Sequence, residues 1–199
     1  MFNAGVVYLN RFASTLKFKP LISQLFMNVK TIIFDFDGVL LLSTEAGLMF
    51  LRRAAIEERA GVPTPDFLKS NWGKNLENEL FPLCARQFNW NQKTSLAISR
   101  RFDRLINNFI FPIPVGANEI LRSLSERYEL AIVSNRRRDS LIACCERSGL
   151  DFSVFKYCND ISAENIIKPD PRVFDFLWER ACRPEEAVFV GDTINYDLA

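Results

Sequence analysis

The sequence of 199 residues contains no histidine. This absence excludes histidine-based zinc sites and every catalytic arrangement in which a histidine activates a serine or a cysteine. The five cysteines show no CxxC spacing, and their odd number fits free thiols in a reducing compartment better than a disulfide framework. Any chemistry must therefore come from carboxylates, hydroxyls, amides and basic side chains.

The sequence also lacks an excess of one charge and a long apolar run. Its formal net charge is +1, which gives no reason to expect a nucleic acid as partner. No apolar run reaches the roughly 18 residues of a membrane span, so we expect no membrane partner. What the chain does have is 48% hydrophobic residues and 18 phenylalanines, enough for a substantial core. We expect a monomer or a weak dimer.

Residues 1–26 differ in composition from the rest of the chain. They contain Arg11, Lys17 and Lys19 but no acidic residue. This composition fits a transit peptide for a mitochondrion or plastid, or an upstream extension of the reading frame, since Met27 would make a natural start. A helix on a membrane surface is a third alternative. We expect this segment to lie outside the fold, and the protein to be cytoplasmic unless the segment targets it to an organelle.

Two aspartates stand at the end of an apolar strand. Residues 30–34 have the short, β-branched character of a strand buried on both faces, and Asp35, Asp37 and Gly38 follow directly. Because Asp and Gly are common turn residues, this stretch could be an ordinary turn. The alternative is a metal or phosphate site, since open α/β sheets bind ligands at the carboxyl ends of parallel strands.

Beyond residue 112 the predicted elements alternate along the chain. Helices are predicted at residues 117–127, at 138–147 and from Pro171 onward, and strands at 130–134, 154–157 and 187–190. Such alternation predicts an α/β fold with a three-layer, Rossmann-like parallel sheet. The chain ends just inside a further predicted helix, so we expect the C-terminal end of this fold to be truncated.

Residues 43–112 are predicted to form a helical insertion after the first core strand. Helices are predicted from Thr44 to about residue 60, at 76–88 and at 95–109, and the first is closed by a glycine and two prolines. We therefore expect a core domain of residues 27–42 and 113–199 and a helical domain of residues 43–112.

Three more polar clusters lie where strands end or helices begin: Ser134 with Asn135, Lys168, and Asp192 with Asp197. In a parallel sheet these positions share one edge, so they can converge with the two aspartates of the first strand. Phosphoryl transfer through an aspartate needs such a set, because Mg²⁺ and a lysine offset the repulsion between a carboxylate nucleophile and a phosphate.

The stretches "DFDGVL", "VSN", "KPDP" and "GDTINYD", in this order and with a helical insertion after the first, resemble the haloacid dehalogenase superfamily. Within it the chain is similar to phosphatases with a small α-helical cap, such as phosphoglycolate phosphatases, and to β-phosphoglucomutase. The resemblance covers residues 29–199. It implies a Mg²⁺-dependent phosphatase that hydrolyses a small phosphorylated metabolite. A sugar-phosphate mutase and a catalytically inactive fragment that acts as a binding protein are the alternatives.

The resemblance also implies a role for each residue of the phosphate site. Asp35 would be the nucleophile that becomes an aspartyl-phosphate, and Asp37 would be the general acid and base. Ser134 would bind the phosphoryl group with help from the backbone N–H of Asn135. Lys168 would neutralise the nucleophile and the phosphate.

The same resemblance implies a metal site. Mg²⁺ would be bound by Asp35, by Asp192 and by the backbone carbonyl of Asp37. Asp197 would support the metal through water or hold Lys168. Each residue also has an ordinary explanation, such as a turn at Asp37 or a surface lysine at Lys168.

Substrate specificity is predicted to reside in the cap. The stretch "SNWGKNLENE" at residues 70–79 lies between two predicted helices, and Lys74 and Asn75 could bind an acidic group and hydroxyls of a substrate. The alternative is that Trp72 anchors the cap's own core and Lys74 is solvated. The three arginines of "NRRRD" at residues 135–139 are predicted to form a solvated helix face.

Overall fold

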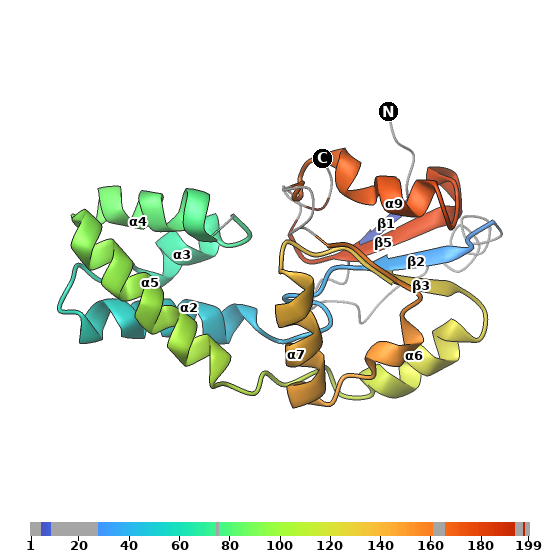
Figure 1. Cartoon of the computed structure of the whole chain (residues 1–199), viewed down its shortest axis with the longest axis horizontal. Helices are drawn as coiled ribbons and strands as arrows, with labels where there is room; N and C mark the ends of the chain where they lie inside the picture. Colours follow the sequence, from blue (N-terminus) through green and yellow to red (C-terminus); the bar gives the residue numbers. More distant parts are fainter. Residues whose placement is uncertain (1–4, 9–27, 75, 161–165, 194–196, 198–199) are drawn as a thin grey trace, which may run out of the picture. The chain divides into compact units, whose positions relative to one another are not determined.

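The computed structural model describes residues 5–8, 28–74, 76–160, 166–193 and 197 (Figure 1). The chain divides into two compact units, Met1–Leu41 with Pro112–Ala199, and Leu42–Phe111. The first unit is an α/β domain and the second is helical. No helix within the described ranges is long and apolar enough to cross a bilayer.

The first unit is built on a five-stranded parallel sheet with the strand order β1-β5-β2-β3-β4. Its strands are β1 (Gly5–Tyr8), β2 (Thr31–Phe34), β3 (Glu129–Ile132), β4 (Tyr157–Cys158) and β5 (Ala187–Gly191). The central strand, β2, pairs with β3 on one side and β5 on the other, and Phe34 is level with Ile132 and Val190. Residues that follow these three positions therefore leave the sheet at the same edge. The predicted α/β fold with a parallel sheet is confirmed.

Helices cover both faces of the sheet. Figure 1 shows α9 (Asp175–Trp178) on one face, and α6 (Ala117–Ser125) and α7 (Arg138–Ser148) on the other. A one-turn 3₁₀ helix, Pro171–Phe174, leads into α9, and Asp170 caps it by accepting a hydrogen bond from the backbone N–H of Arg172. The core on this side of the sheet is made of buried apolar residues, among them Ile33, Val133, Val173, Leu177 and Phe189.

The predicted strand at residues 154–157 is misplaced. Phe152–Val154 instead forms a 3₁₀ turn, because the side chain of Asp151 caps it by accepting a hydrogen bond from the backbone N–H of Ser153. The strand β4 begins only at Tyr157. Local capping chemistry therefore outweighs the strand propensity of Val154 and Phe155.

The expectation that residues 1–26 lie outside the fold does not hold for residues 5–8. These form β1, which pairs in parallel with β5, with Val6 level with Phe189 and Val7 level with Val190. The other edge of β5 is taken by β2, so β5 offers one free row of backbone donors and acceptors. The β-branched Val-Val pair suits an extended segment that pairs along this row.

The second unit consists of helices α2 (Thr44–Glu57), α3 (Pro65–Asn71), α4 (Phe81–Gln87) and α5 (Gln92–Asn107), with a π-helical turn at Leu76–Leu80. Helix α3 was not predicted, because Pro63 and Pro65 were interpreted only as the end of the preceding helix. Thr64 in fact caps it by accepting a hydrogen bond from the backbone N–H of Phe67, and Pro65 occupies the first helical position, where proline is well tolerated.

Candidate functional site

Asp35 lies at the centre of the carboxyl edge of the sheet. Its backbone N–H donates to the carbonyl of Val190 at 2.8 Å, which continues the pairing of β2 with β5 by one residue. The residue is 8% exposed, and Oδ1 accepts a hydrogen bond from the backbone N–H of Phe36 at 2.7 Å. Burial raises the pKa of Asp35 to about 7, and this shift is opposed by Lys168 and increased by Asp197.

The chain turns sharply after Asp37. Gly38 has a φ of 87°, in the left-handed region that glycine adopts without strain. Its N–H donates to the carbonyl of Leu41, and the N–H groups of Leu40 and Leu41 both donate to the carbonyl of Phe36. The turn expected from the Asp-Gly pair is therefore present, and it lies directly beside the candidate site.

Lys168 joins two carboxylates in the interior. Its Nζ lies 2.9 Å from Oδ1 of Asp35 and 2.7 Å from Oδ1 of Asp197, and the residue is only 3% exposed. Burial by itself lowers the pKa of Lys168, but the two carboxylates outweigh it and hold this pKa above its usual value. Lys168 is therefore a buried ammonium ion, and the interpretation of a surface lysine is wrong.

Three carboxylates form a group that can hold a metal ion. Asp35, Asp192 and Asp197 each offer one oxygen, and these three oxygens lie within 4.8 Å of one another. Oxygen donors of this kind are the ligands that Mg²⁺ prefers, so the donor set fits that ion. Gly191 makes room for the group, because a Cβ at this position would lie 2.3 Å from Oδ2 of Asp197.

Ser134 is held at the next strand end by an asparagine that the sequence interpretation missed. The buried side chain of Asn159 accepts from the N–H of Ser134 and donates to its carbonyl, both at 2.9 Å. Asn159 directly follows β4, so the rule that singled out polar residues at strand ends would have found it once the end of that strand was known. The hydroxyl of Ser134 accepts a hydrogen bond from the backbone N–H of Arg136 at 3.1 Å.

The side chain of Asn135 connects two loops of the site. Its Oδ1 accepts from the backbone N–H of Lys168 at 2.7 Å, and its Nδ2 donates to the carbonyl of the same residue at 3.0 Å. The predicted role of its backbone N–H in phosphate binding stays a prediction. The side-chain role was not foreseen, and it places Lys168 relative to the end of β3.

Arg136 is not part of a solvated helix face, and this expectation is corrected. Its Nε and Nη2 donate to the two carboxylate oxygens of Asp37, at 2.9 and 2.7 Å, and its side chain is 16% exposed. Burial lowers the pKa of Arg136, but the charge of Asp37 outweighs this effect and raises it. Arg137 and Arg138, by contrast, are exposed as predicted.

The predicted specificity residues lie in the helical unit. Asn75 lies outside the described residues, and Lys74 falls in a turn after α3. Trp72 packs against α2, because a Cβ on Gly47 would lie 2.4 Å from Cζ2 of the indole. This close approach shows that Trp72 contributes to the packing of the unit, while a role of Lys74 and Asn75 in specificity stays a prediction.

Comparisons with known proteins gave one family match. A family model described as a haloacid dehalogenase-like hydrolase matches residues 29–199. A sequence comparison with curated proteins gave no match.

Several solved structures share the fold. A structure from Haemophilus somnus, described as a predicted phosphoglycolate phosphatase, has a TM-score of 0.72 at 21% identity, over 85% of this chain and 80% of that one. A structure from Thermotoga maritima named as a β-phosphoglucomutase has a TM-score of 0.64 at 21% identity, over 84% and 78% of the two chains. A hydrolase of the same family from Bacillus subtilis, YfnB, bound to magnesium, has a TM-score of 0.65 at 20% identity, over 86% and 83%.

Proposed function

Because this chain belongs to the haloacid dehalogenase-like hydrolase family, we propose that it is a magnesium-dependent phosphatase that hydrolyses a small phosphate monoester through an aspartyl-phosphate. The observation that supports the proposal most directly is the buried contact of Lys168 with Asp35, which is itself one of a group of three carboxylates. A fold has no structural need for so many charges at one strand end, since burying each of them costs free energy. A reaction that transfers a charged group uses them all.

The first step proposed is phosphoryl transfer to Asp35. A carboxylate oxygen of Asp35 attacks phosphorus, and the bond between phosphorus and the ester oxygen breaks with its electron pair on that oxygen. The leaving oxygen takes a proton from Asp37, so the products are an alcohol and the aspartyl-phosphate.

The second step proposed is hydrolysis of the aspartyl-phosphate. Water attacks phosphorus and gives a proton to Asp37, and the bond to Asp35 breaks with its electron pair returning to the carboxylate. Lys168 neutralises charge on Asp35, and the hydroxyl of Ser134 would bind a phosphoryl oxygen. Mg²⁺, held by Asp35, Asp192 and the carbonyl of Asp37, with Asp197 beside it, would supply positive charge against the phosphoryl oxygens.

The test is hydrolysis of p-nitrophenyl phosphate in the presence of Mg²⁺. We expect the parent protein to release p-nitrophenol and Asp35→Asn to lose at least about 10³-fold in kcat, as is usual when a nucleophile is removed. Asp139→Asn is a matched control, because Asp139 is an exposed aspartate that contacts Arg137 and the backbone N–H of Ser140 at the start of α7. Equal rates for the parent and Asp35→Asn would contradict the proposal and favour a binding protein without catalysis.

A sugar-phosphate mutase is the second candidate, since the fold is also shared with the Thermotoga maritima structure named as a β-phosphoglucomutase. Both reactions would use the same aspartyl-phosphate and differ in its acceptor. Incubation with β-glucose 1-phosphate and a trace of glucose 1,6-bisphosphate distinguishes them, because a mutase forms glucose 6-phosphate. Release of inorganic phosphate without isomerisation would exclude the mutase.

A further inference from the structure

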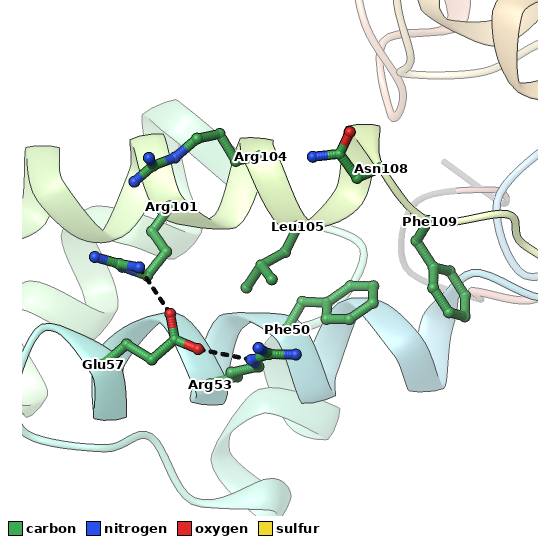
Figure 2. A pocket seen from close by; sticks show the side chains of 8 residues that line it. All are labelled: Phe50, Arg53, Glu57, Arg101, Arg104, Leu105, Asn108 and Phe109. Carbon is green, nitrogen blue, oxygen red and sulfur yellow. Dashed lines mark hydrogen bonds and ion pairs between the residues drawn. The ribbon is translucent and has the colours of Figure 1, made fainter.

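The helical unit contains a groove between α2 and α5 that plays no part in the proposed reaction (Figure 2). Its volume is about 440 Å³, and much of it is open to solvent. Eight residues line it: Phe50, Arg53 and Glu57 from α2, and Arg101, Arg104, Leu105, Asn108 and Phe109 from α5 and the residues after it. The residues from each helix recur at intervals of three and four, so the groove is formed by one face of each helix.

One end of the groove is occupied by ion pairs. Figure 2 shows Glu57 between two arginines, and its two oxygens accept from Nε of Arg53 at 2.7 Å and from Nη1 of Arg101 at 2.8 Å. Nε of Arg101 also donates to Glu58 at 2.5 Å. Two arginines are thus matched by two glutamates, and this end of the groove carries no surplus of charge.

Arg104 supplies the charge that is not matched. Within the described parts of the chain its guanidinium has no ion pair and no side-chain hydrogen bond, and it is exposed. Asn108, one turn further along α5, lines the groove beside it and offers an amide that can donate and accept hydrogen bonds. A guanidinium fork suits a carboxylate or another planar anion, and an amide on the next turn of the same helix can add a hydrogen bond.

The remaining lining residues are apolar. The rings of Phe50 and Phe109 contact each other edge to face, with centroids 5.0 Å apart and planes at 76°. Phe50 is buried, whereas Leu105 and Phe109 are half-buried and keep part of their surface accessible from the groove. These side chains provide an apolar surface on which a flat ring can pack.

We propose that this groove is a binding site for a small anion that carries an aromatic group. The anion pairs with Arg104 and the amide of Asn108, and the ring packs against Leu105 and Phe109. All eight lining residues belong to the helical unit and all residues of the acidic site belong to the α/β unit, so the inference goes beyond the proposed phosphatase activity.

The test is a calorimetric titration of the full chain with 1-naphthoate. We expect a dissociation constant in the high micromolar to millimolar range, as is normal for a ligand of this size. Acetate lacks the ring and 1-naphthalenemethanol lacks the charge, and each should bind at least about tenfold more weakly. Equal binding of acetate and 1-naphthoate would overturn the proposal, because the apolar surface would then contribute nothing.

Two variants test whether 1-naphthoate binds in this groove. Arg104→Gln should raise the dissociation constant of 1-naphthoate about tenfold, the size expected for a lost charge-assisted pair. Arg100→Gln is the matched control, because Arg100 is an exposed arginine of the same helix that does not line the groove, and it should leave the constant unchanged. Circular dichroism verifies that both variants fold.

Two further results would overturn the proposal, namely equal affinity of Arg104→Gln and the parent, and loss of binding in Ser134→Ala. The second result would place 1-naphthoate at the phosphate site. Since no readout depends on turnover, an inactive parent protein would contradict the phosphatase proposal and leave this test intact.

Discussion

Both units contain a network in which basic side chains are shared between carboxylates, but the two networks differ in burial. In the α/β unit, Lys168 contacts Asp35 and Asp197, and the three side chains are between 1% and 11% exposed. In the helical unit, Arg101 contacts Glu57 and Glu58, and these side chains are between 23% and 32% exposed. The distances are similar in both networks, so distance alone does not distinguish them.

The difference in burial decides what each network does. Exposed pairs gain little, because water and salt screen the charges. Buried charges keep strong interactions, and each depends on its partner to offset its loss of hydration. The buried network is thus costly to keep and damaging to break, which is expected of a reactive site, whereas the exposed network contributes solubility and weak pairing.

The largest expected effect follows from removal of the shared lysine. Lys168→Met leaves two carboxylates buried without their cation, and we expect a loss of about 3–5 kcal/mol in the free energy of unfolding. Urea unfolding at pH 7 in EDTA measures it. Lys156→Met is the control, since Lys156 pairs with Glu129 at the surface and should leave the unfolding midpoint nearly unchanged. Equal losses in the free energy of unfolding for Lys168→Met and Lys156→Met would show that burial does not determine how much each lysine stabilises the protein.

The next effect is a gain in stability that depends on pH. Because the pKa of Asp35 is raised to about 7, the folded protein binds more protons than the unfolded chain between about pH 4 and pH 7, and its stability falls as pH rises through this window. Asp35→Asn does not titrate and keeps an oxygen acceptor. We expect it to be more stable than the parent by on the order of 2 kcal/mol at pH 8 without metal.

Melting temperatures at pH 5 and pH 8 in EDTA test whether stability falls as pH rises. The advantage of Asp35→Asn over the parent should be small at pH 5 and larger at pH 8. An advantage that shrinks as pH rises would mean that Lys168, rather than burial, dominates the environment of Asp35.

A smaller effect is expected for the pair of Arg136 and Asp37. Arg136→Gln removes two charge-assisted hydrogen bonds to the half-buried carboxylate of Asp37, and we expect a loss of about 1–2 kcal/mol in the free energy of unfolding. Arg137→Gln is the neighbouring control, because Arg137 is exposed and its ion pair is with the equally exposed Asp139. Thermal unfolding of both variants measures the loss. A larger drop in melting temperature for Arg137→Gln than for Arg136→Gln would contradict a stabilising role of the Arg136–Asp37 pair.

The smallest effect is expected in the exposed network. Arg101→Met should shift the melting temperature by no more than about one degree, and 0.5 M NaCl should reduce even this shift because the pairs are screened. A larger shift in melting temperature that salt does not reduce would show that the ion pairs of the helical unit stabilise it as strongly as buried pairs do.

The polar residues at the carboxyl edge could be predicted from the sequence because they lie close to a strand end or a helix start. A parallel sheet brings such positions together whatever the loops between them do. Asp35, Lys168 and Asp197 meet for this reason. Asp35 and Lys168 are 133 positions apart in the sequence, and Lys168 and Asp197 are 29 positions apart. The contact of Lys168 with Asp197 was one of two alternatives from the sequence, and only the geometry selected it.

The supporting residues could not be predicted in the same way. Arg136 stands among three successive arginines, and nothing in their order shows that the first reaches back to Asp37 while the next two face solvent. Asn159 was missed because the end of β4 was placed wrongly. The pairing of residues 5–8 with β5 was missed because a four-residue strand at a sheet edge depends on an open partner, which composition does not reveal.

The sequence by itself therefore determined the α/β alternation, the helical insertion and the set of charged residues at one edge, because these follow from local periodicity and from strand order. Only the tertiary structure decided which of those residues are buried, which partner each charge has, and where the groove with Arg104 lies. Burial and pairing depend on contacts between segments far apart in the chain, and the free energy of a charge depends on both.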